Sequence, residues 1–200
     1  MAENQNLALN KHHHSHWHYL HRRRTRRRAS TEREIFLGQI VSLIGASVAG
    51  LVLEASKGKL AALVGAYLIL PGIFDLSGSA AGAMGARLNH TLTNKTGHKS
   101  FVIKAVVSSL LLVLCSSVFL AVFSAIVATI IFGANFASIV AVTVGAVAIS
   151  SLIGFPLIAI FTVFTKKGGV NPDNFIGPVE SSLFDILSIF SVTLMVVWLS

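Results

Sequence analysis

Residues 105–165 read AVVSSLLLVLCSSVFLAVFSAIVATIIFGANFASIVAVTVGAVAISSLIGFPLIAIFTVFT and contain no charged side chain. One membrane crossing needs about 20 apolar residues, because the hydrocarbon core is about 30 Å thick. This stretch is therefore long enough for two crossings. Gly133-Ala134-Asn135 is a turn signal near its middle. The stretch predicts two transmembrane helices, at about Ala105–Phe132 and about Phe136–Thr165.

The composition of the whole chain agrees with a membrane protein. Of the 200 residues, 54% are hydrophobic and 12% are charged, and the mean hydropathy is +0.74. A water-soluble domain of this size would need more charge to cover its surface. The single cysteine, Cys115, excludes a disulfide framework, and its apolar neighbours predict a packed, inert thiol. We expect a multi-pass protein of the cell membrane.

Three further segments have the length and hydrophobicity of membrane spans. The first is Ile35–Leu53, and a short link at Ala55–Lys59 follows it. The second runs from Leu60 to about Leu92, and the last covers about Phe175–Leu199. The predicted fold class is an all-α membrane protein with five transmembrane helices, whose transport domain covers residues 35–200.

The basic residues predict the orientation of these helices. If the N-terminus is cytoplasmic, only Lys57 and Lys59 of the 16 Lys and Arg side chains lie outside. The positive-inside rule therefore predicts an N-in, C-out topology.

Residues 1–34 predict a disordered cytoplasmic tail, because they are polar and then strongly basic. Arg22–Arg28 would be attracted to anionic lipid headgroups. The histidines at 12–21 could bind a soft divalent metal loosely or be a solubilising segment. A role of the basic residues in setting the membrane topology explains the positive charge more simply than a role in binding nucleic acid does. We therefore expect no nucleic-acid partner.

Three acidic residues fall within predicted spans: Asp75, Glu180 and Asp185. A carboxylate at the bilayer centre costs about 2.5–3.5 kcal/mol on insertion scales, so such residues are candidates for function. Asp185 lies near mid-membrane, and Ser181, Asp185 and Ser188 share one helical face at i, i+4 and i+7. The alternative is an acid that only holds helices together. Glu180 follows Pro178 and is either an ion ligand or a residue at the cytoplasmic mouth.

The second span carries a matching face. Asp75, Ser79, Gly82 and Ala86 fall at i, i+4, i+7 and i+11. Gly78 and Gly82 form a G-x-x-x-G pair, which is either a surface for close helix packing or a place where an ion can reach backbone carbonyls.

The chemistry of these groups favours a hard cation. Carboxylates and hydroxyls suit Mg²⁺, Ca²⁺ or Mn²⁺ better than zinc or copper. One aspartate per chain on a two-fold axis would give two carboxylates to one divalent ion, which favours a homodimer. The sequence has no HExxH and no G-x-S-x-G motif, and we do not expect an enzyme.

Several motifs in the chain resemble the MgtE family of magnesium transporters in order and spacing. The matching segments are Gly145-Ala146-Val147, Gly154-Phe155-Pro156-Leu157, Asn171-Pro172-Asp173, Gly177 to Asp185, and Pro71 to Ser79 with Ala86-Arg87-Leu88. The second span is similar to that of archaeal half-size and eukaryotic solute-carrier members. The large cytoplasmic regulatory domains of bacterial members have no counterpart in this sequence.

The resemblance implies a homodimer of five-helix protomers with the ion pathway lined by the second and fifth helices. It implies that Asp185 is the central ligand of the pore. It also implies that the carbonyl found one turn earlier in the family corresponds to the carbonyl of Ser181. The family's glycine-asparagine pair is Gly78-Ser79 here, so the role of that amide does not carry over to Ser79. The sequence therefore predicts a divalent-cation transporter or channel with Mg²⁺ as the expected ion. The predicted metal-site residues are Asp185, Ser181, Asp75, Glu180 and Ser79. The alternative is a non-conducting assembly or regulatory subunit.

Overall fold

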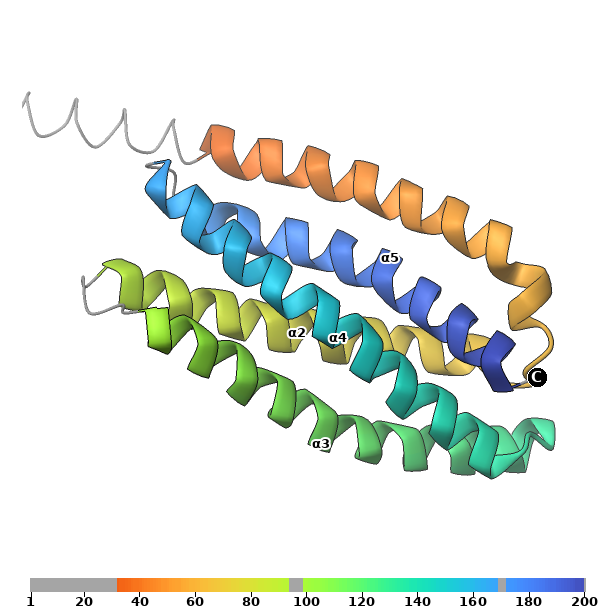
Figure 1. Ribbon diagram of the computed structural model, residues 1–200. Helices are drawn as coiled ribbons and strands as arrows, with labels where there is room; N and C mark the ends of the chain where they lie inside the picture. Colours follow the sequence, from red (N-terminus) through yellow and green to blue (C-terminus); the bar gives the residue numbers. More distant parts are fainter. Residues whose placement is uncertain (1–31, 94–98, 169–171, 200) are drawn as a thin grey trace, which may run out of the picture. The chain divides into compact units, whose positions relative to one another are not determined.

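The structure is a computed structural model that describes residues 32–93, 99–168 and 172–199. Its five long helices are Glu32–Leu60, α2 (Ala66–Thr93), α3 (Lys99–Phe132), α4 (Phe136–Lys167) and α5 (Asp173–Leu199) (Figure 1). Each is long and apolar enough to cross a membrane, which confirms the prediction of five spans. The tail predicted over 1–34 lies outside the described residues except for 32–34, which begin the first helix.

The chain divides into two units, 1–37 and 38–200. In the first unit, the described residues 32–37 are helical. The second unit holds the rest of the first helix together with α2, α3, α4 and α5, and it is the subject of everything below.

The turn between the first two helices lies later than the sequence predicted. The first helix continues through the expected link to Leu60, where Lys57 forms an ion pair with Glu54 at the i, i+3 helical spacing. The chain then turns before α2, and Gly65 adopts a positive φ of 89°. Glycine adopts the left-handed conformation without strain. The turn is therefore at Gly65 and not at the charged residues of the expected link, Lys57 and Lys59.

The turn at Gly133-Ala134-Asn135 is where the sequence predicted it. Gly133 has a φ of 66°, so it adopts the left-handed conformation that commonly ends an α-helix. Its N–H donates to the carbonyl of Thr129 and so closes the last turn of α3. Asn135 caps α4, because its side-chain oxygen accepts a hydrogen bond from the Ser138 N–H at 3.2 Å. Three residues therefore suffice to reverse the chain between two long helices.

Helix α4 lies at the centre of the second unit, where it contacts α2, α3 and α5. Its buried residues recur along its whole length, from Ile139 to Thr162. Thr143 and Thr162 are buried, and each donates its hydroxyl to the carbonyl four residues earlier, at 2.7 and 2.8 Å. These polar side chains are satisfied within the helix itself, as an apolar environment requires.

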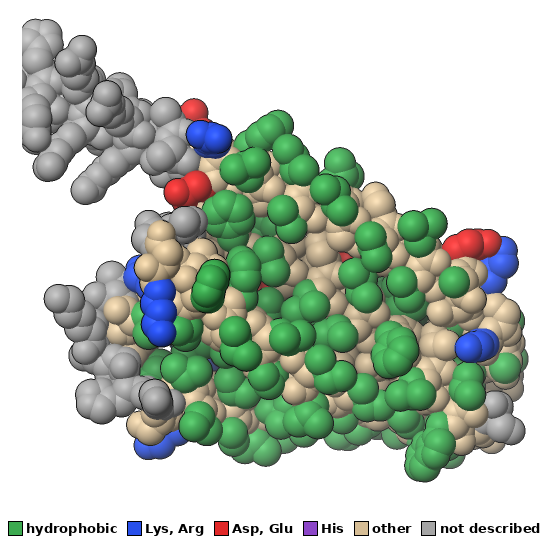
Figure 2. All heavy atoms as spheres, turned by 45° about the horizontal axis from the view of Figure 1, so that its top comes forward, with side chains coloured by type: hydrophobic (Ala, Val, Ile, Leu, Met, Phe, Trp, Pro, Cys, Tyr) green, Lys and Arg blue, Asp and Glu red, His purple; other side chains and the backbone are tan. Residues whose placement is uncertain are grey.

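Large hydrophobic side chains cover the outer surface of the bundle. Phe119 is 83% exposed and Phe164 78%, and Figure 2 shows hydrophobic side chains spread over most of the visible face. Cys115, which was predicted to be packed, is exposed on this surface. That prediction was wrong because α3 packs against α2 and α4 with part of its circumference, and the rest of a uniformly apolar helix faces outward.

Candidate ion-binding site

A cavity of about 480 Å³ lies between α2 and α5. Its lining residues, which define the acidic cavity, are Pro71, Phe74, Asp75, Gly78 and Ser79 from α2 and Glu180, Ser181 and Asp185 from α5. All five residues that the sequence singled out as metal-site candidates line it. Three of them are acids and two carry hydroxyls, and none of the described lining residues is basic.

Helix α2 presents Asp75 and Ser79 to the cavity from adjacent turns, as their i, i+4 spacing predicts. Both side chains are exposed in the single chain. The Ser79 hydroxyl donates to the carbonyl of Leu76 at 3.3 Å, so its oxygen remains able to accept or coordinate. Pro71 begins this face one turn earlier and supplies no N–H. Ala86, predicted on the same face, is exposed but does not line the cavity.

The two glycines of the G-x-x-x-G pair have different surroundings. A Cβ at Gly78 would meet nothing within 4 Å, and Gly78 borders the cavity instead of a neighbouring helix. A Cβ at Gly82 would overlap the carboxylate of Glu180. Of the pair, only Gly82 therefore lies against a neighbouring helix of this chain, which is α5. Gly78 leaves the cavity open, and Gly82 makes room for an acidic side chain.

Glu180 of α5 lines the cavity and is partly enclosed by the protein. Its side chain is half-buried, and its Oε2 is fully buried without a hydrogen-bond partner among the described residues. An unpartnered buried carboxylate oxygen is costly in an apolar environment, so its retention needs a functional reason.

Helix α5 contributes Ser181, which is exposed, and Asp185, which is half-buried near the middle of the span Asn174–Leu199. Ser188 was predicted on the same face, but it is completely buried and does not line the cavity. The acidic cavity thus ends before the turn that carries Ser188, whose side chain packs inside the bundle.

An aromatic contact fixes α5 against α4 next to Asp185. The rings of Phe155 and Phe184 lie 5.7 Å apart at an angle of 58°, and both side chains are fully buried. The Phe184 ring lies over Gly154, where a Cβ would overlap it. Since Phe184 directly precedes Asp185, this contact sets the rotation of α5 that turns the carboxylate toward the acidic cavity.

The first helix approaches α5 through small residues that sequence reasoning did not single out. The Ser182 hydroxyl lies 3.2 Å from the carbonyl of Ser42 and 3.1 Å from that of Pro178, and it can donate to either. A Cβ at Gly45 would overlap Ser182, and one at Gly38 would lie 3.1 Å from the carbonyl of Asn174. Gly38 and Gly45 are seven residues apart, so they fall on one face of the helix, and this spacing was the available signal.

The acidic cavity can hold a cation with its water. Among the described residues, no three acidic, histidine or cysteine side chains lie close enough together to hold a metal ion directly. Carboxylates and hydroxyls around a space of this size can instead contact the bound waters of a hard cation.

The fold and the cavity together define a multi-pass membrane protein with an acid-lined site inside its spans. The sequence model of the MgtE family, described as a divalent cation transporter, matches residues 70–195, which is more than half of the chain and contains the whole acidic cavity. The chain belongs to the MgtE family. No curated protein matches it.

Proposed function

We propose that this protein conducts Mg²⁺ across the membrane through the acidic cavity, with the pathway completed by a second copy of the chain. Membership of a divalent cation transporter family supports transport. The observation that carries the proposal is the gathering of Asp75, Glu180 and Asp185 around one cavity between two membrane spans. Intramembrane acids that only held helices together would be expected to face partners, not a shared space.

The ligand chemistry favours Mg²⁺ among divalent ions. Every side-chain ligand available in the cavity is an oxygen, which suits hard cations. Mg²⁺ dehydrates reluctantly and is usually bound through one or two carboxylates and several retained waters. One water occupies about 30 Å³ in the liquid, so a cavity of about 480 Å³ has room for the ion with its hydration shell.

The exposure of the site in a single chain favours a homodimer. Asp75, Ser79 and Ser181 are exposed although they lie within membrane spans. A carboxylate facing lipid at such depth costs about 2.5–3.5 kcal/mol on insertion scales. A second copy placed over the α2–α5 face would cover these side chains and add a second set of carboxylates, which together would balance the charge of a divalent ion.

Asp185 is the ligand that we propose to be central, with Asp75, Glu180, Ser79 and Ser181 as further contacts. It is the lining acid nearest the middle of its span, and packing of the adjacent Phe184 holds its position. The predicted topology would open the Glu180 end of α5 toward the cytoplasm. The predicted basic tail would add attraction to anionic headgroups there.

Mg²⁺ uptake into liposomes that contain only the purified protein tests the proposal. We expect uptake by the wild type and nearly background uptake by Asp185→Asn, because the variant keeps the side-chain shape but removes the charge. Glu54→Gln is the matched control, since Glu54 is an exposed acid outside the cavity, and its uptake should equal that of the wild type.

Two results would contradict the proposal. Wild-type uptake at the level of empty liposomes would favour a non-conducting assembly or regulatory subunit. Wild-type uptake by a folded Asp185→Asn protein would remove Asp185 from the pathway, and Asp75→Asn and Glu180→Gln would then identify which acid replaces it.

A further inference from the structure

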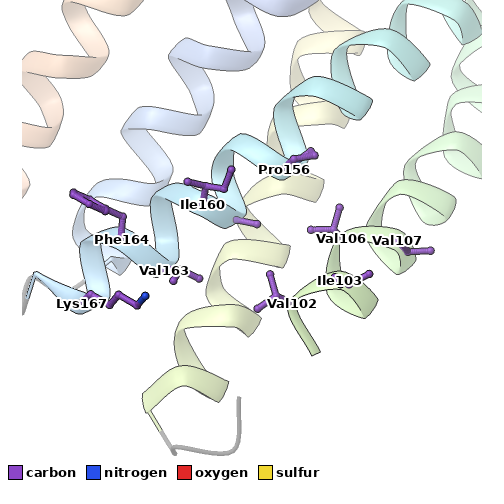
Figure 3. Close-up of a pocket in the computed structure, with 10 residues that line it drawn as sticks. Val102, Ile103, Val106, Val107, Pro156, Ile160, Val163, Phe164 and Lys167 are labelled. Carbon is purple, nitrogen blue, oxygen red and sulfur yellow. The ribbon is translucent and has the colours of Figure 1, made fainter. Parts of the chain in front are cut away.

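A second hollow lies between α3 and α4, away from the acidic cavity, and has a volume of about 500 Å³ (Figure 3). Its lining residues, which define the α3–α4 groove, are Val102, Ile103, Val106, Val107, Pro156, Ala159, Ile160, Val163, Phe164 and Lys167. Nine of these ten side chains are apolar, and a hollow of this size falls in the range that holds small molecules.

The groove lies within two membrane spans, Ser100–Phe132 and Phe136–Lys167. Phe164 is 78% exposed and Ile103 64%, so the walls face outward from the bundle. An apolar furrow on the lipid-facing surface of a membrane protein fits a hydrocarbon chain better than a polar solute.

One charged group lies at the end of this apolar furrow. Lys167 ends α4, and Figure 3 shows it at the end of the groove, beyond Val163 on the same helix. Its side chain is exposed and has no ion-pair partner among the described residues. A lysine at the membrane end of an apolar groove complements a ligand that carries one apolar chain and one negative head.

We propose that the α3–α4 groove binds an anionic phospholipid, with an acyl chain between Val106 and Ile160 and the headgroup phosphate at the Lys167 ammonium. Basic positions between transmembrane helices bind anionic headgroups by this arrangement. The site is separate from the acidic cavity, and it does not depend on which ion that cavity conducts. The occupant is a lipid and not a free phosphate, because the apolar walls supply most of the contact surface.

A tryptophan placed in the groove gives a local test. In the full-length Ile160→Trp protein, the fluorescence of the new tryptophan is quenched by lipids that carry brominated acyl chains. Comparing the quenching by phosphatidylglycerol with that by phosphatidylcholine, both with the same brominated chains, gives the relative binding constant of the two lipids at residue 160. Ile160 is 65% exposed, so a larger side chain fits. Phe123→Trp is the matched host, because Phe123 is 64% exposed on α3 and does not line the groove. The signal of the native tryptophans is subtracted from both.

We expect phosphatidylglycerol to be preferred about fivefold at residue 160 and not at residue 123. Adding Lys167→Gln to the Ile160→Trp host should bring the preference close to one. Adding Lys104→Gln should leave it unchanged, because Lys104 is an exposed lysine of α3 that does not line the groove.

Three outcomes would overturn the site. A ratio near one at residue 160 would show that no anionic lipid is selected there. An equal loss from Lys104→Gln and Lys167→Gln would show a general charge effect. Absence of quenching by either lipid would show that a second copy of the chain, and not lipid, covers the groove.

Discussion

Gly82 and the carboxylate of Glu180 face each other so closely that a methyl group on α2 at this position would displace the carboxylate. The contact joins the two helices that line the acidic cavity, and it holds a carboxylate whose Oε2 is buried without a partner among the described residues. A glycine within a helix costs about 1 kcal/mol relative to alanine, so its presence here needs a reason. The space that it leaves for Glu180 is that reason.

Gly82→Ala should therefore destabilise the protein, although alanine is the better helix former. We expect the free energy of unfolding to fall by no more than about 1 kcal/mol, because the carboxylate that the methyl group displaces is the end of a flexible side chain. Thermal unfolding in detergent measures this change. Gly50→Ala is the control, since a Cβ there meets nothing within 4 Å, and it should be neutral or slightly stabilising.

The double variant Gly82→Ala/Glu180→Asp makes the test specific to this contact. Aspartate is shorter by one methylene group, so it should recover part of the stability that Gly82→Ala loses. If Gly82→Ala proved as stable as Gly50→Ala, the contact would not constrain α2 and α5.

Gly154→Ala should disturb α5 from the opposite side. The new methyl group would overlap the ring of Phe184, and the cost should be about 1–3 kcal/mol. Because Phe184 precedes Asp185, Mg²⁺ uptake should fall with the stability. Phe184→Leu in the same chain should relieve the overlap, so the two substitutions should show coupling in a double-mutant cycle. Strictly additive effects would contradict the proposed role of this contact.

Chemical cross-linking should locate the dimer interface. Ser181→Cys combined with Cys115→Ser places the only cysteine beside the acidic cavity, and a short bismaleimide should link two chains. The wild-type protein carries its own control, because Cys115 is exposed on α3 and should not link under the same conditions. Linking through Cys115 but not through residue 181 would place the interface on α3 and contradict a pathway at the α2–α5 face.

Removal of residues 1–28 should leave transport in place. The predicted tail has no apolar periodicity and precedes the first span, so it should contribute neither to packing nor to the pathway. Uptake by the truncated protein in neutral liposomes should match that of the full chain. A truncated protein that inserted and folded normally but conducted no Mg²⁺ would show that the tail is part of the mechanism.

The sequence predicted the features that depend on hydrophobic length and helical period. Five spans, the turn at residues 133–135, the shared face of Asp75 with Ser79 and that of Ser181 with Asp185 follow from those two properties. That these two faces meet was implied by the resemblance to the MgtE family and not by periodicity. Periodicity assigns residues to a face of one helix, but it does not say how far a neighbouring helix covers that face. For this reason Ser188 was expected at the cavity and is buried, whereas Cys115 was expected to be buried and is exposed.

The sequence did not allow us to predict which residues of neighbouring helices contact each other. Glycines were visible as small residues, but their partners were not. Gly82 faces a carboxylate, Gly154 a phenyl ring and Gly45 a serine. Which of these a glycine meets depends on the relative rotation of two helices, and a single sequence without aligned relatives carries little information about that rotation.

The three-residue turn after α3 has a consequence for biogenesis. The α3–α4 hairpin has no charge from residue 105 to residue 165 and only a three-residue turn at its tip, so it can pass from the translocon into lipid as one unit. Helices α2 and α5 carry the acids and enter lipid less readily by themselves. The hairpin thus gives α5, which is synthesised after it, an apolar wall to pack against, and α4 contacts both acid-carrying helices.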